Sequence, residues 1–500
     1  MENIRVLQLG TENWADKLVI PAEVEWNYIK KVAEYEDAPY DVVFLSRPPL
    51  EAEMKYLQWN VKAYTLFVLK DMSENKQLAE LMLRKKGQYI EARDLQNFIY
   101  EKLRYYYHWS YGEKYLFENL DINQSFKGRI KWFGNRYVSL EGEYGQEFSQ
   151  IISWRTTLPI KGGQSIDFWL EYSKDDDVEL ELEITKFRGG SVSTVQNVWN
   201  FSESDLQDEV TITLPDGDDQ GYFFASLKAR GKGRLDIVAL HDRHSRHGIG
   251  EFVPGGERYV TSDKEELFCY FDPGDRKPPL NVYFSGYRTQ EGFEGYNMLR
   301  RLGCPFLLIT DARLEGGCFY LGSQEYEQMV SGAIQKYVDE LKFSSEDLIF
   351  SGISMGTFGA IRYGCDFAPR TIIMGKPLVN VGQIALNEKF LRPGGFPTAI
   401  DVLYKTMGST DKQSAFILDQ RFWNRFDAVN WENTKFVISY MIEDDYDPKA
   451  YQNLIEHLHS IGVKVYGKGI HGRHNDDTSG IVKWFVTQFN ELLRDDFGRK

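Results

Sequence analysis

Short apolar runs alternate with amphipathic stretches at the start of the chain. The apolar runs, typical of strands buried on both faces, occupy residues 4–9, 41–45 and 63–69. The amphipathic stretches, which have apolar positions at helical spacing, occupy residues 23–35, 51–59 and 75–84. This alternation predicts a small doubly wound α/β domain over residues 1–115. Gly10 follows the first run without a G-x-G-x-x-G sequence, so nucleotide binding there is poorly supported.

From about residue 120 the pattern changes to alternation of single apolar and polar positions. The alternating segments occupy residues 168–172, 178–184, 210–214, 222–229 and 235–240. Turn-forming clusters separate them at residues 174–177, 215–219 and 231–233. This predicts a central antiparallel β-sandwich of jelly-roll type over residues 116–274. Trp154, Trp169 and Trp199 are candidates for stacking against carbohydrate, although tryptophan in a sandwich is more often part of the core.

Strand and helix patterns alternate again from about residue 275 to the end of the chain. Strands are predicted at residues 280–284, 306–310, 348–350, 371–374, 436–441 and 463–466. Helices are predicted at residues 324–341, 449–461 and 481–493, with another that begins near residue 358. Residues 377–430 interrupt this rhythm and are interpreted as a lid or cap.

The pentapeptide Gly352-Ile353-Ser354-Met355-Gly356 connects the predicted strand at 348–350 to the helix that follows. A serine on such a tight turn needs a small residue two positions before and after it, because larger side chains would clash with the strand and helix. The pentapeptide alone is weak evidence, and its place between strand and helix carries the inference. The sequence therefore predicts an α/β-hydrolase catalytic domain over residues 275–500.

A serine hydroxyl becomes a good nucleophile when an imidazole takes its proton and a carboxylate orients that imidazole. In this fold the chain order is serine, acid, histidine. The predicted strand at 436–441 leads into an acidic cluster, and that at 463–466 leads into two histidines. We expect Ser354 as nucleophile and His474 as base, with His471 as the alternate. The acid is Asp444 or Glu443.

An acyl-transfer site also needs backbone N–H groups aimed at the developing oxyanion. Met355 should supply one, and Gly286 or Tyr287, after the strand at 280–284, should supply the other. Arg288 in the same loop is either a substrate contact or a surface arginine. The remaining acidic residues, Asp445 and Asp447, are expected to cap the helix that starts near Pro448.

Composition narrows the class of protein. With 500 residues, 42% of them hydrophobic and 27% charged, the chain is typical of a multidomain globular protein. No 18-residue apolar run occurs and the N-terminus lacks the basic and apolar regions of a signal peptide, so we expect a cytoplasmic protein without a transmembrane segment. A net charge of −15 argues against nucleic acid as the main partner.

Metal chemistry is poorly supported. The four cysteines form no C-x-x-C pair and are expected to be buried free thiols: Cys269, Cys304, Cys318 and Cys365. Residues 241–247 contain three histidines, but the two arginines between them would repel a cation. We interpret that stretch as a polar loop at a domain junction. No metal and no cofactor are expected.

Four motifs together resemble the second accessory Sec-system proteins of Gram-positive bacteria, and the resemblance covers the whole chain. The motifs are FSGYR (284–288), GISMG (352–356), YMIEDDYD (440–447) and GIHGRH (469–474). The resemblance implies a cytoplasmic protein, held at the inner face of the membrane through an export complex. Its implied partners are the first and third accessory Sec proteins, the accessory SecA motor and the exported serine-rich-repeat glycoprotein.

The same resemblance implies O-acetylation of N-acetylglucosamine on the adhesin before export. Ser354 would then accept the acyl group and His474 would act as base. The family's acid is described as a glutamate, which leaves Glu443 and Asp444 both open. The acyl donor is not identified, and acetyl-CoA is one candidate. A carbohydrate acetylesterase and a non-catalytic export scaffold are the alternatives.

Overall fold

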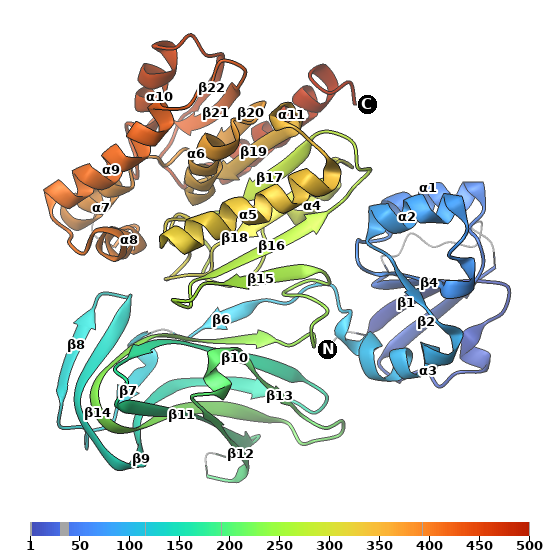
Figure 1. Ribbon diagram of the computed structural model, residues 1–500, viewed down its shortest axis with the longest axis horizontal. Coiled ribbons are helices and arrows are strands. Elements are labelled where there is room, and N and C mark those ends of the chain that lie inside the picture. Colours follow the sequence, from blue (N-terminus) through green and yellow to red (C-terminus); the bar gives the residue numbers. More distant parts are fainter. Residues whose placement is uncertain (1–2, 31–39, 116, 192, 393, 500) are drawn as a thin grey trace.

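The computed structural model describes residues 3–30, 40–115, 117–191, 193–392 and 394–499. It is a mixed α/β protein with three sheets (Figure 1). The N-terminal sheet lies to one side, and the central antiparallel sheet lies below the C-terminal sheet in this view. The N-terminal and C-terminal sheets each have an apolar core on both faces, and the central sheet encloses one.

The N-terminal sheet has five parallel strands in the order β2-β1-β3-β4-β5, an order typical of doubly wound folds. The strands are β1 (Ile4–Leu9), β2 (Val24–Ile29), β3 (Val42–Leu45), β4 (Leu66–Leu69) and β5 (Gln88–Ile90). The α-helices are α1 (Glu51–Asn60), α2 (Lys76–Lys85) and the short α3 (Leu95–Asn97). The helices expected at 51–59 and 75–84 are therefore confirmed.

The helix expected over residues 23–35 is wrong in its first part, because β2 occupies that segment. Residues 31–35 lie outside the described residues. In β2 the residues Val24, Trp26 and Tyr28 alternate with polar or aliphatic ones, and β-branched and aromatic residues fit the pleated surface of a sheet. Trp26 also stacks on Phe44 of β3, with ring centroids 5.6 Å apart. Packing within the sheet therefore decides the conformation of this segment.

The central sheet has nine strands, and all of its pairings are antiparallel. Its strands are β6 (Gly112–Lys114), β7 (Leu120–Ile122), β8 (Arg129–Phe133), β9 (Tyr137–Ile160), β10 (Ser165–Lys174), β11 (Val178–Arg188), β12 (Val195–Ser202), β13 (Val210–Thr213) and β14 (Gly221–His244). The long strands β9 and β14 join the whole region into one continuous sheet. A sandwich would have two separate sheets, whereas here hydrogen bonds along β9 and β14 connect all nine strands into one sheet.

The turn expected at residues 231–233 is wrong, because β14 runs through it. The register with β9 shifts at this point, and Gly231 has φ +95°. A Cβ atom on Gly231 would lie 2.0 Å from the carbonyl oxygen of Asp177. The glycines thus mark a bulge within a strand and no chain reversal.

Of the three tryptophans considered as carbohydrate-stacking candidates, two have the core role that is more frequent in a sandwich. Trp154 and Trp169 are each only 1% exposed. Trp199 is half-buried and packs edge-on against Phe223 at 5.7 Å. These rings belong to the core.

The C-terminal sheet has eight strands in the order β15-β16-β18-β17-β19-β20-β21-β22, and β16 alone runs opposite to the other seven. The strands are β15 (Gly256–Val260), β16 (Glu266–Asp272), β17 (Leu280–Phe284), β18 (Phe306–Thr310), β19 (Leu348–Ile353), β20 (Thr371–Gly375), β21 (Lys435–Met441) and β22 (Val465–Ile470). The sheet thus begins before residue 275, earlier than the expected division.

The C-terminal helices are α4 (Tyr296–Arg300), α5 (Gln324–Leu341), α6 (Met355–Phe367), α7 (Val381–Phe390), α8 (Thr398–Met407), α9 (Lys412–Asp427), α10 (Ala450–His459) and α11 (Thr478–Asp495). Helices α7 to α9 form the segment inserted between β20 and β21, which we call the cap. Among the described residues, no helix has both the length and the apolar character needed to cross a membrane.

This strand order determines where the site lies. The strands β17 and β19 to β22 are parallel, so the loops that follow them emerge at one edge of the sheet. Because β17 pairs with β19, the loop after β17 lies beside the turn after β19. The loops after β21 and β22 complete the same edge.

Candidate active site

The turn between β19 and α6 consists of a single residue, Ser354, with φ 55° and ψ −125°. This strained backbone projects the side chain away from both elements. A Cβ atom on Gly352 would lie 2.3 Å from the backbone of Gly356, and one on Gly356 would lie 2.1 Å from the carbonyl oxygen of Phe284. The two glycines are therefore required by close backbone approach.

Ser354, His474 and Asp444 form one hydrogen-bonded chain. Ser354 Oγ lies 2.8 Å from His474 Nε2, so the hydroxyl can donate to the imidazole. His474 Nδ1 lies 2.7 Å from Asp444 Oδ2. The three residues follow β19, β22 and β21, and the His474 side chain is only 1% exposed. The structure thus brings together the expected nucleophile, base and one of the two expected acids.

Asp444 is held in a fixed orientation. Its Oδ1 accepts hydrogen bonds from the backbone N–H groups of Tyr446 at 2.9 Å and Asp447 at 3.1 Å. Burial alone would raise the pKa of Asp444, but the hydrogen bond and charge of His474, with the two backbone donors, bring it below its usual value. The group is therefore a carboxylate that accepts the Nδ1–H of His474.

The alternates Glu443 and His471 pair with each other and take no part in the hydrogen bonds that join Ser354, His474 and Asp444. His471 Nδ1 lies 3.1 Å from Glu443 Oε1, and the two side chains are 86% and 51% exposed. Glu443 also accepts the backbone N–H of Gly472 at 2.6 Å. The structure brings neither residue into hydrogen-bond contact with Ser354.

Tyr446 and Asp445 hold the base in place, a role that the sequence did not suggest. The Tyr446 ring stacks on the imidazole of His474, with centroids 4.3 Å apart. Asp445 Oδ1 accepts the backbone N–H of His474 at 3.1 Å, and its Oδ2 accepts from Arg392 Nε of the cap at 2.7 Å. The guanidinium of Arg392 also lies 3.9 Å from the centroid of the Tyr446 ring. The cap therefore contacts the residues that orient the imidazole.

The expected capping role of Asp445 and Asp447 is wrong. The helix α10 starts at Ala450, after Pro448, and no side-chain hydrogen bond caps it. Asp447 is buried and accepts the backbone N–H groups of Val379 at 2.9 Å and Asn380 at 2.8 Å. Asp447 therefore joins the start of the cap to the loop after β21 that carries Asp444.

The backbone N–H groups predicted to form the oxyanion hole differ in whether they already have a hydrogen-bond acceptor. Within the described residues, the N–H groups of Met355 and Tyr287 donate no hydrogen bond. Gly286 N–H, in contrast, donates to Glu294 Oε2 at 2.7 Å. Of the two candidates in this loop, Tyr287 therefore has the free donor, and Gly286 anchors the loop.

Arg288 does not reach the hydrogen-bonded chain of Ser354. Its guanidinium donates to backbone carbonyl oxygens of its own loop, those of Gln290 and Phe293. A contact with substrate stays a prediction.

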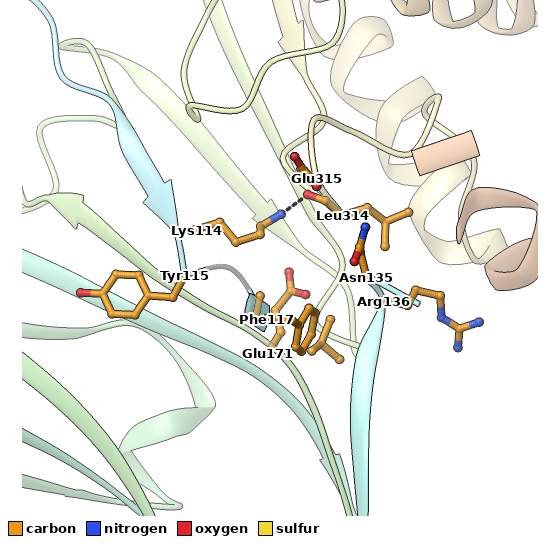
Figure 2. A pocket seen from close by; sticks show the side chains of 10 residues that line it. Lys114, Tyr115, Phe117, Asn135, Arg136, Glu171, Leu314 and Glu315 are labelled. Carbon is orange, nitrogen blue, oxygen red and sulfur yellow. Dashed lines mark hydrogen bonds between the residues drawn. The ribbon is translucent and has the colours of Figure 1, made fainter. Parts of the chain in front are cut away.

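A cavity of about 290 Å³ is lined by residues of the central sheet and by Leu314 and Glu315 of the C-terminal region (Figure 2). Lys114 of β6 donates to the carbonyl oxygen of Leu314 at its edge. Glu315 lines the cavity and accepts from the hydroxyl of Tyr287 at 3.3 Å. The loop after β17, which carries Tyr287 and which we call the oxyanion loop, therefore contacts one residue of the cavity lining.

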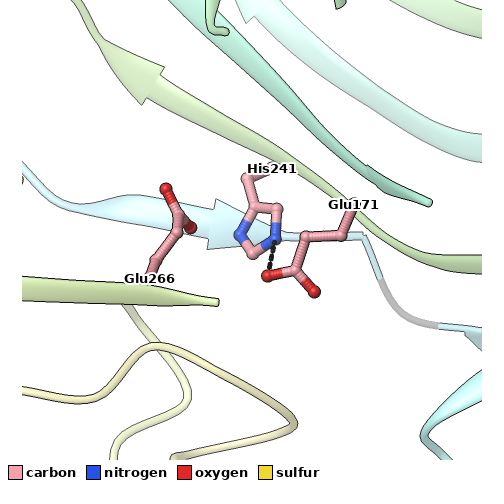
Figure 3. Close-up of side chains that lie close together, drawn as sticks. All are labelled: Glu171, His241 and Glu266. Carbon is pink, nitrogen blue, oxygen red and sulfur yellow. Dashed lines mark ion pairs between the residues drawn. The ribbon is translucent and has the colours of Figure 1, made fainter. Parts of the chain in front are cut away.

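Three buried residues at this junction, Glu171, His241 and Glu266, have ligand-type atoms within 4.8 Å of one another (Figure 3). His241 Nε2 lies 3.5 Å from Glu171 Oε1. Both oxygens of Glu266, however, accept from Arg243, at 2.8 and 2.7 Å. A metal ion would face this guanidinium, so the residues fit an ion-pair network better than a metal centre.

This network corrects the expected polar loop at 241–247. Residues 241–244 belong to β14, and His241 and Arg243 are fully buried. His241 Nδ1 lies 2.5 Å from Glu291 Oε1, and Arg243 Nε donates to Glu291 Oε2 at 2.7 Å. Glu291 belongs to the loop that carries Tyr287 and Glu294. The central sheet therefore anchors the oxyanion loop.

Similarity to known proteins extends over the whole chain. An accessory Sec system protein of Streptococcus gordonii is 38% identical over 508 residues, which cover 99% of both chains. One from Staphylococcus aureus (strain NCTC 8325 / PS 47) is 37% identical and covers 99% of this chain and 97% of the relative. The Glycosylation Associate Protein (Gap123) complex of Streptococcus agalactiae contains a chain with a TM-score of 0.87 and 34% identity, over 100% of this chain and 99% of that one.

A family model described as the accessory Sec system GspB-transporter matches residues 4–499. Both the match to this model and the full-length relatives lead to one assignment. The chain belongs to the accessory Sec system GspB-transporter family.

Proposed function

We propose that this chain is a serine-dependent O-acyltransferase that acetylates N-acetylglucosamine on a serine-rich-repeat glycoprotein exported by the accessory Sec system. The observation that carries the proposal is the unbroken hydrogen-bonded chain from Ser354 through His474 to Asp444, at 2.8 and 2.7 Å. Nucleophile, base and orienting acid are the parts that acyl transfer needs.

The architecture supports an α/β-hydrolase assignment. The eight-stranded order, the antiparallel second strand and the one-residue turn at Ser354 are the features that this fold uses to present a nucleophile. The acid follows β21 and the histidine follows β22, in the chain order of that fold.

In the first half-reaction, Ser354 Oγ attacks the carbonyl carbon of the acyl donor while His474 Nε2 takes the hydroxyl proton. Asp444 stabilises the imidazolium that forms. The N–H groups of Met355 and Tyr287 would donate to the oxyanion of the tetrahedral intermediate. The intermediate collapses to an acyl-serine, and His474 returns the proton to the leaving group.

In the second half-reaction, a sugar hydroxyl attacks the acyl-serine carbonyl carbon and gives its proton to His474. The bond between that carbon and Ser354 Oγ then breaks, and His474 returns the proton to Ser354 Oγ as the acylated sugar leaves. Water in the same position would make the enzyme an esterase. His474 is buried beneath Tyr446, whereas Ser354 is only partly buried, so an acceptor can reach the acyl-serine. Transfer to a sugar in preference to water is the part of the proposal that comes from the family resemblance.

The partners follow from the family. The matched Streptococcus agalactiae chain is part of the Gap123 complex. We propose that this chain works on the cytoplasmic side of the membrane with the first and third accessory Sec proteins. The accessory SecA motor and the serine-rich-repeat glycoprotein are the further proposed partners. Acetyl-CoA remains the candidate acyl donor.

The test uses the purified chain, acetyl-CoA and a glycopeptide that carries N-acetylglucosamine. We expect acetylated glycopeptide with the wild-type chain and none with Ser354→Ala, and the same substitution should abolish labelling by a fluorophosphonate. Acetyl release to water at the same rate with and without the glycopeptide would identify an esterase. Full acetylation by Ser354→Ala would remove the serine from the mechanism, and no acetylation by the wild-type chain would favour the non-catalytic scaffold.

A further inference from the structure

A second, larger cavity of about 640 Å³ lies where the N-terminal sheet meets the other two. Its wall combines the starts of β1 and β3, the end of β14 and helix α4. The ionisable side chains that line it are Arg5, Asp41, Lys62, His108, His244 and Arg300. Asp41 is therefore the single acidic residue of this lining.

The positive charges of the cavity exceed the carboxylates around it. Lys62 pairs with Asp41 at 3.2 Å, and Arg5 pairs with Glu25 at 3.4 Å. Arg300 donates instead to two uncharged acceptors, the carbonyl oxygens of Trp59 and Asn60. Among the residues that the structure describes, no carboxylate lies within ion-pair distance of Arg300.

Arg246 adds a second uncompensated charge behind the wall. It is 2% exposed and donates to backbone carbonyl oxygens, including those of Tyr107 and His108 in the cavity lining. No described carboxylate pairs with it either. Burying a guanidinium without a carboxylate partner is costly, so the buried Arg246 and the partly exposed Arg300 together make this cavity positive in a chain of net charge −15.

The neighbouring titratable groups respond to this field. Burial, with the charges of Arg300 and Arg246 added, lowers the pKa of Lys62 to about 8 even though Asp41 opposes the shift. Burial, with Lys62, Arg300 and Arg246, lowers the pKa of His108 to about 3. Burial and then Arg246 lower the pKa of His244 as well. Burial is the largest cause of these shifts, and the charges of Arg246 and Arg300 add to it, so further positive charge is disfavoured beside the cavity.

We propose that this cavity binds a small molecule that carries a phosphate or pyrophosphate group. Guanidinium and ammonium groups are the usual partners of phosphate oxygens, and Arg300 and Lys62 supply one of each. The volume lies within the range of small-molecule sites and exceeds the needs of a single phosphate. The site is separate from Ser354, and nothing in the acyl-transfer proposal requires it.

The experiment is calorimetric titration of the full chain with inorganic pyrophosphate, and in a second arm with ADP. We expect pyrophosphate to bind, with an affinity that falls as salt is added. Tighter binding of ADP would identify a phosphate ester as the ligand class, and equal or tighter binding of pyrophosphate would identify the free anion. Both outcomes support an anion site.

Arg300→Gln should weaken pyrophosphate binding at least tenfold. Lys232→Gln is the matched control, because it removes the same charge from an exposed position (73%) on β14 and should leave the affinity unchanged. Equal affinities of the two variants, or no binding by the wild-type chain at millimolar pyrophosphate, would overturn the proposal.

A second variant keeps the proposal testable if Arg300→Gln does not fold. Asp41→Asn removes the carboxylate that neutralises Lys62, so it should tighten pyrophosphate binding several-fold. A folded Asp41→Asn variant with unchanged or weaker affinity would place the anion elsewhere.

Discussion

Asp444 Oδ2 lies 2.7 Å from His474 Nδ1, while Oδ1 of the same carboxylate is held by two backbone N–H groups. The second oxygen can therefore point in one direction, toward the imidazole. The resemblance implied a glutamate as the acid, and here the shorter aspartate occupies the position. The neighbouring Glu443 lies outside and cannot replace it.

Substitution of Asp444 and of Glu443, each in turn, should show which carboxylate contributes to kcat. Asp444→Asn should lower kcat about 10³- to 10⁴-fold, because an amide favours the wrong tautomer of His474. Glu443→Gln changes an exposed pair with His471 and should leave kcat unchanged. Initial rates of acetyl-ester turnover measure both. Similar losses in the two variants would refute the assignment of Asp444.

The two histidines allow a parallel comparison. His474→Gln removes the group that takes the proton from Ser354, so kcat should fall by about 10³-fold or more. His471→Gln alters a side chain that is 86% exposed and should keep full activity. The rate of fluorophosphonate labelling reports directly on the nucleophilicity of Ser354. Unimpaired labelling of His474→Gln would rule out this base.

Glu294 is expected to act through the oxyanion loop. Glu294→Ala removes the acceptor of the Gly286 N–H and should lower kcat about 10-fold with little change in KM, because the neighbouring Tyr287 N–H loses its position. Glu294→Gln keeps an oxygen that can accept this bond and is the matched control, expected to retain most of the activity. Steady-state kinetics with an acetyl ester separate kcat from KM. A wild-type kcat in Glu294→Ala would show that the loop is held by other contacts.

The close backbone contacts of Gly352 and Gly356, on either side of Ser354, should make substitution of these glycines destabilising. A Cβ on Gly352 would lie 2.3 Å from the backbone of Gly356, so Gly352→Ala should destabilise the protein by about 3 kcal/mol. Gly332 lies in α5 with nothing within 4 Å of an added Cβ, and Gly332→Ala should stabilise the protein by about 0.5–1 kcal/mol. The midpoints of thermal unfolding of the two variants should move in opposite directions. A Gly352→Ala variant as stable as the wild type would show that the turn can relax.

Several elements could be predicted from local sequence alone because local forces determine them. The helix α5 begins and ends where its apolar spacing predicts, after a serine that caps it. The strands β17 and β18 are mainly apolar runs bounded by turn residues, and Asn281 is the polar position within β17. The candidate nucleophile, acid and base could be located because each follows a parallel strand, and parallel strands end at one edge of the sheet.

Other features depend on partners that are distant in the sequence. The stretch 241–247 resembles a polar loop until Glu171, Glu266 and Glu291 are known to lie around it. The choice between Glu443 and Asp444 depends on a difference of one residue in where a turn begins. Local sequence does not determine that difference, but the two backbone donors to Asp444 do.

The buried ion-pair network should make stability depend on pH in a predictable direction. Burial lowers the pKa of His241, but Glu291 and Glu171 outweigh it and raise the pKa above the usual 6.5. The protonated imidazole therefore stabilises the folded state fully below pH 6.5, and this contribution is lost as pH rises through the raised value.

His241→Gln should then cost more stability at about pH 6 than at about pH 9, because only the protonated imidazole pairs with both carboxylates. Thermal unfolding of the wild type and the variant at both pH values measures the difference. His471→Gln serves as the control, since its exposed pair with Glu443 contributes little at either pH. Equal destabilisation by His241→Gln at both values would mean that His241 is neutral in the folded protein, and that Arg243 alone anchors Glu291 and the oxyanion loop by charge.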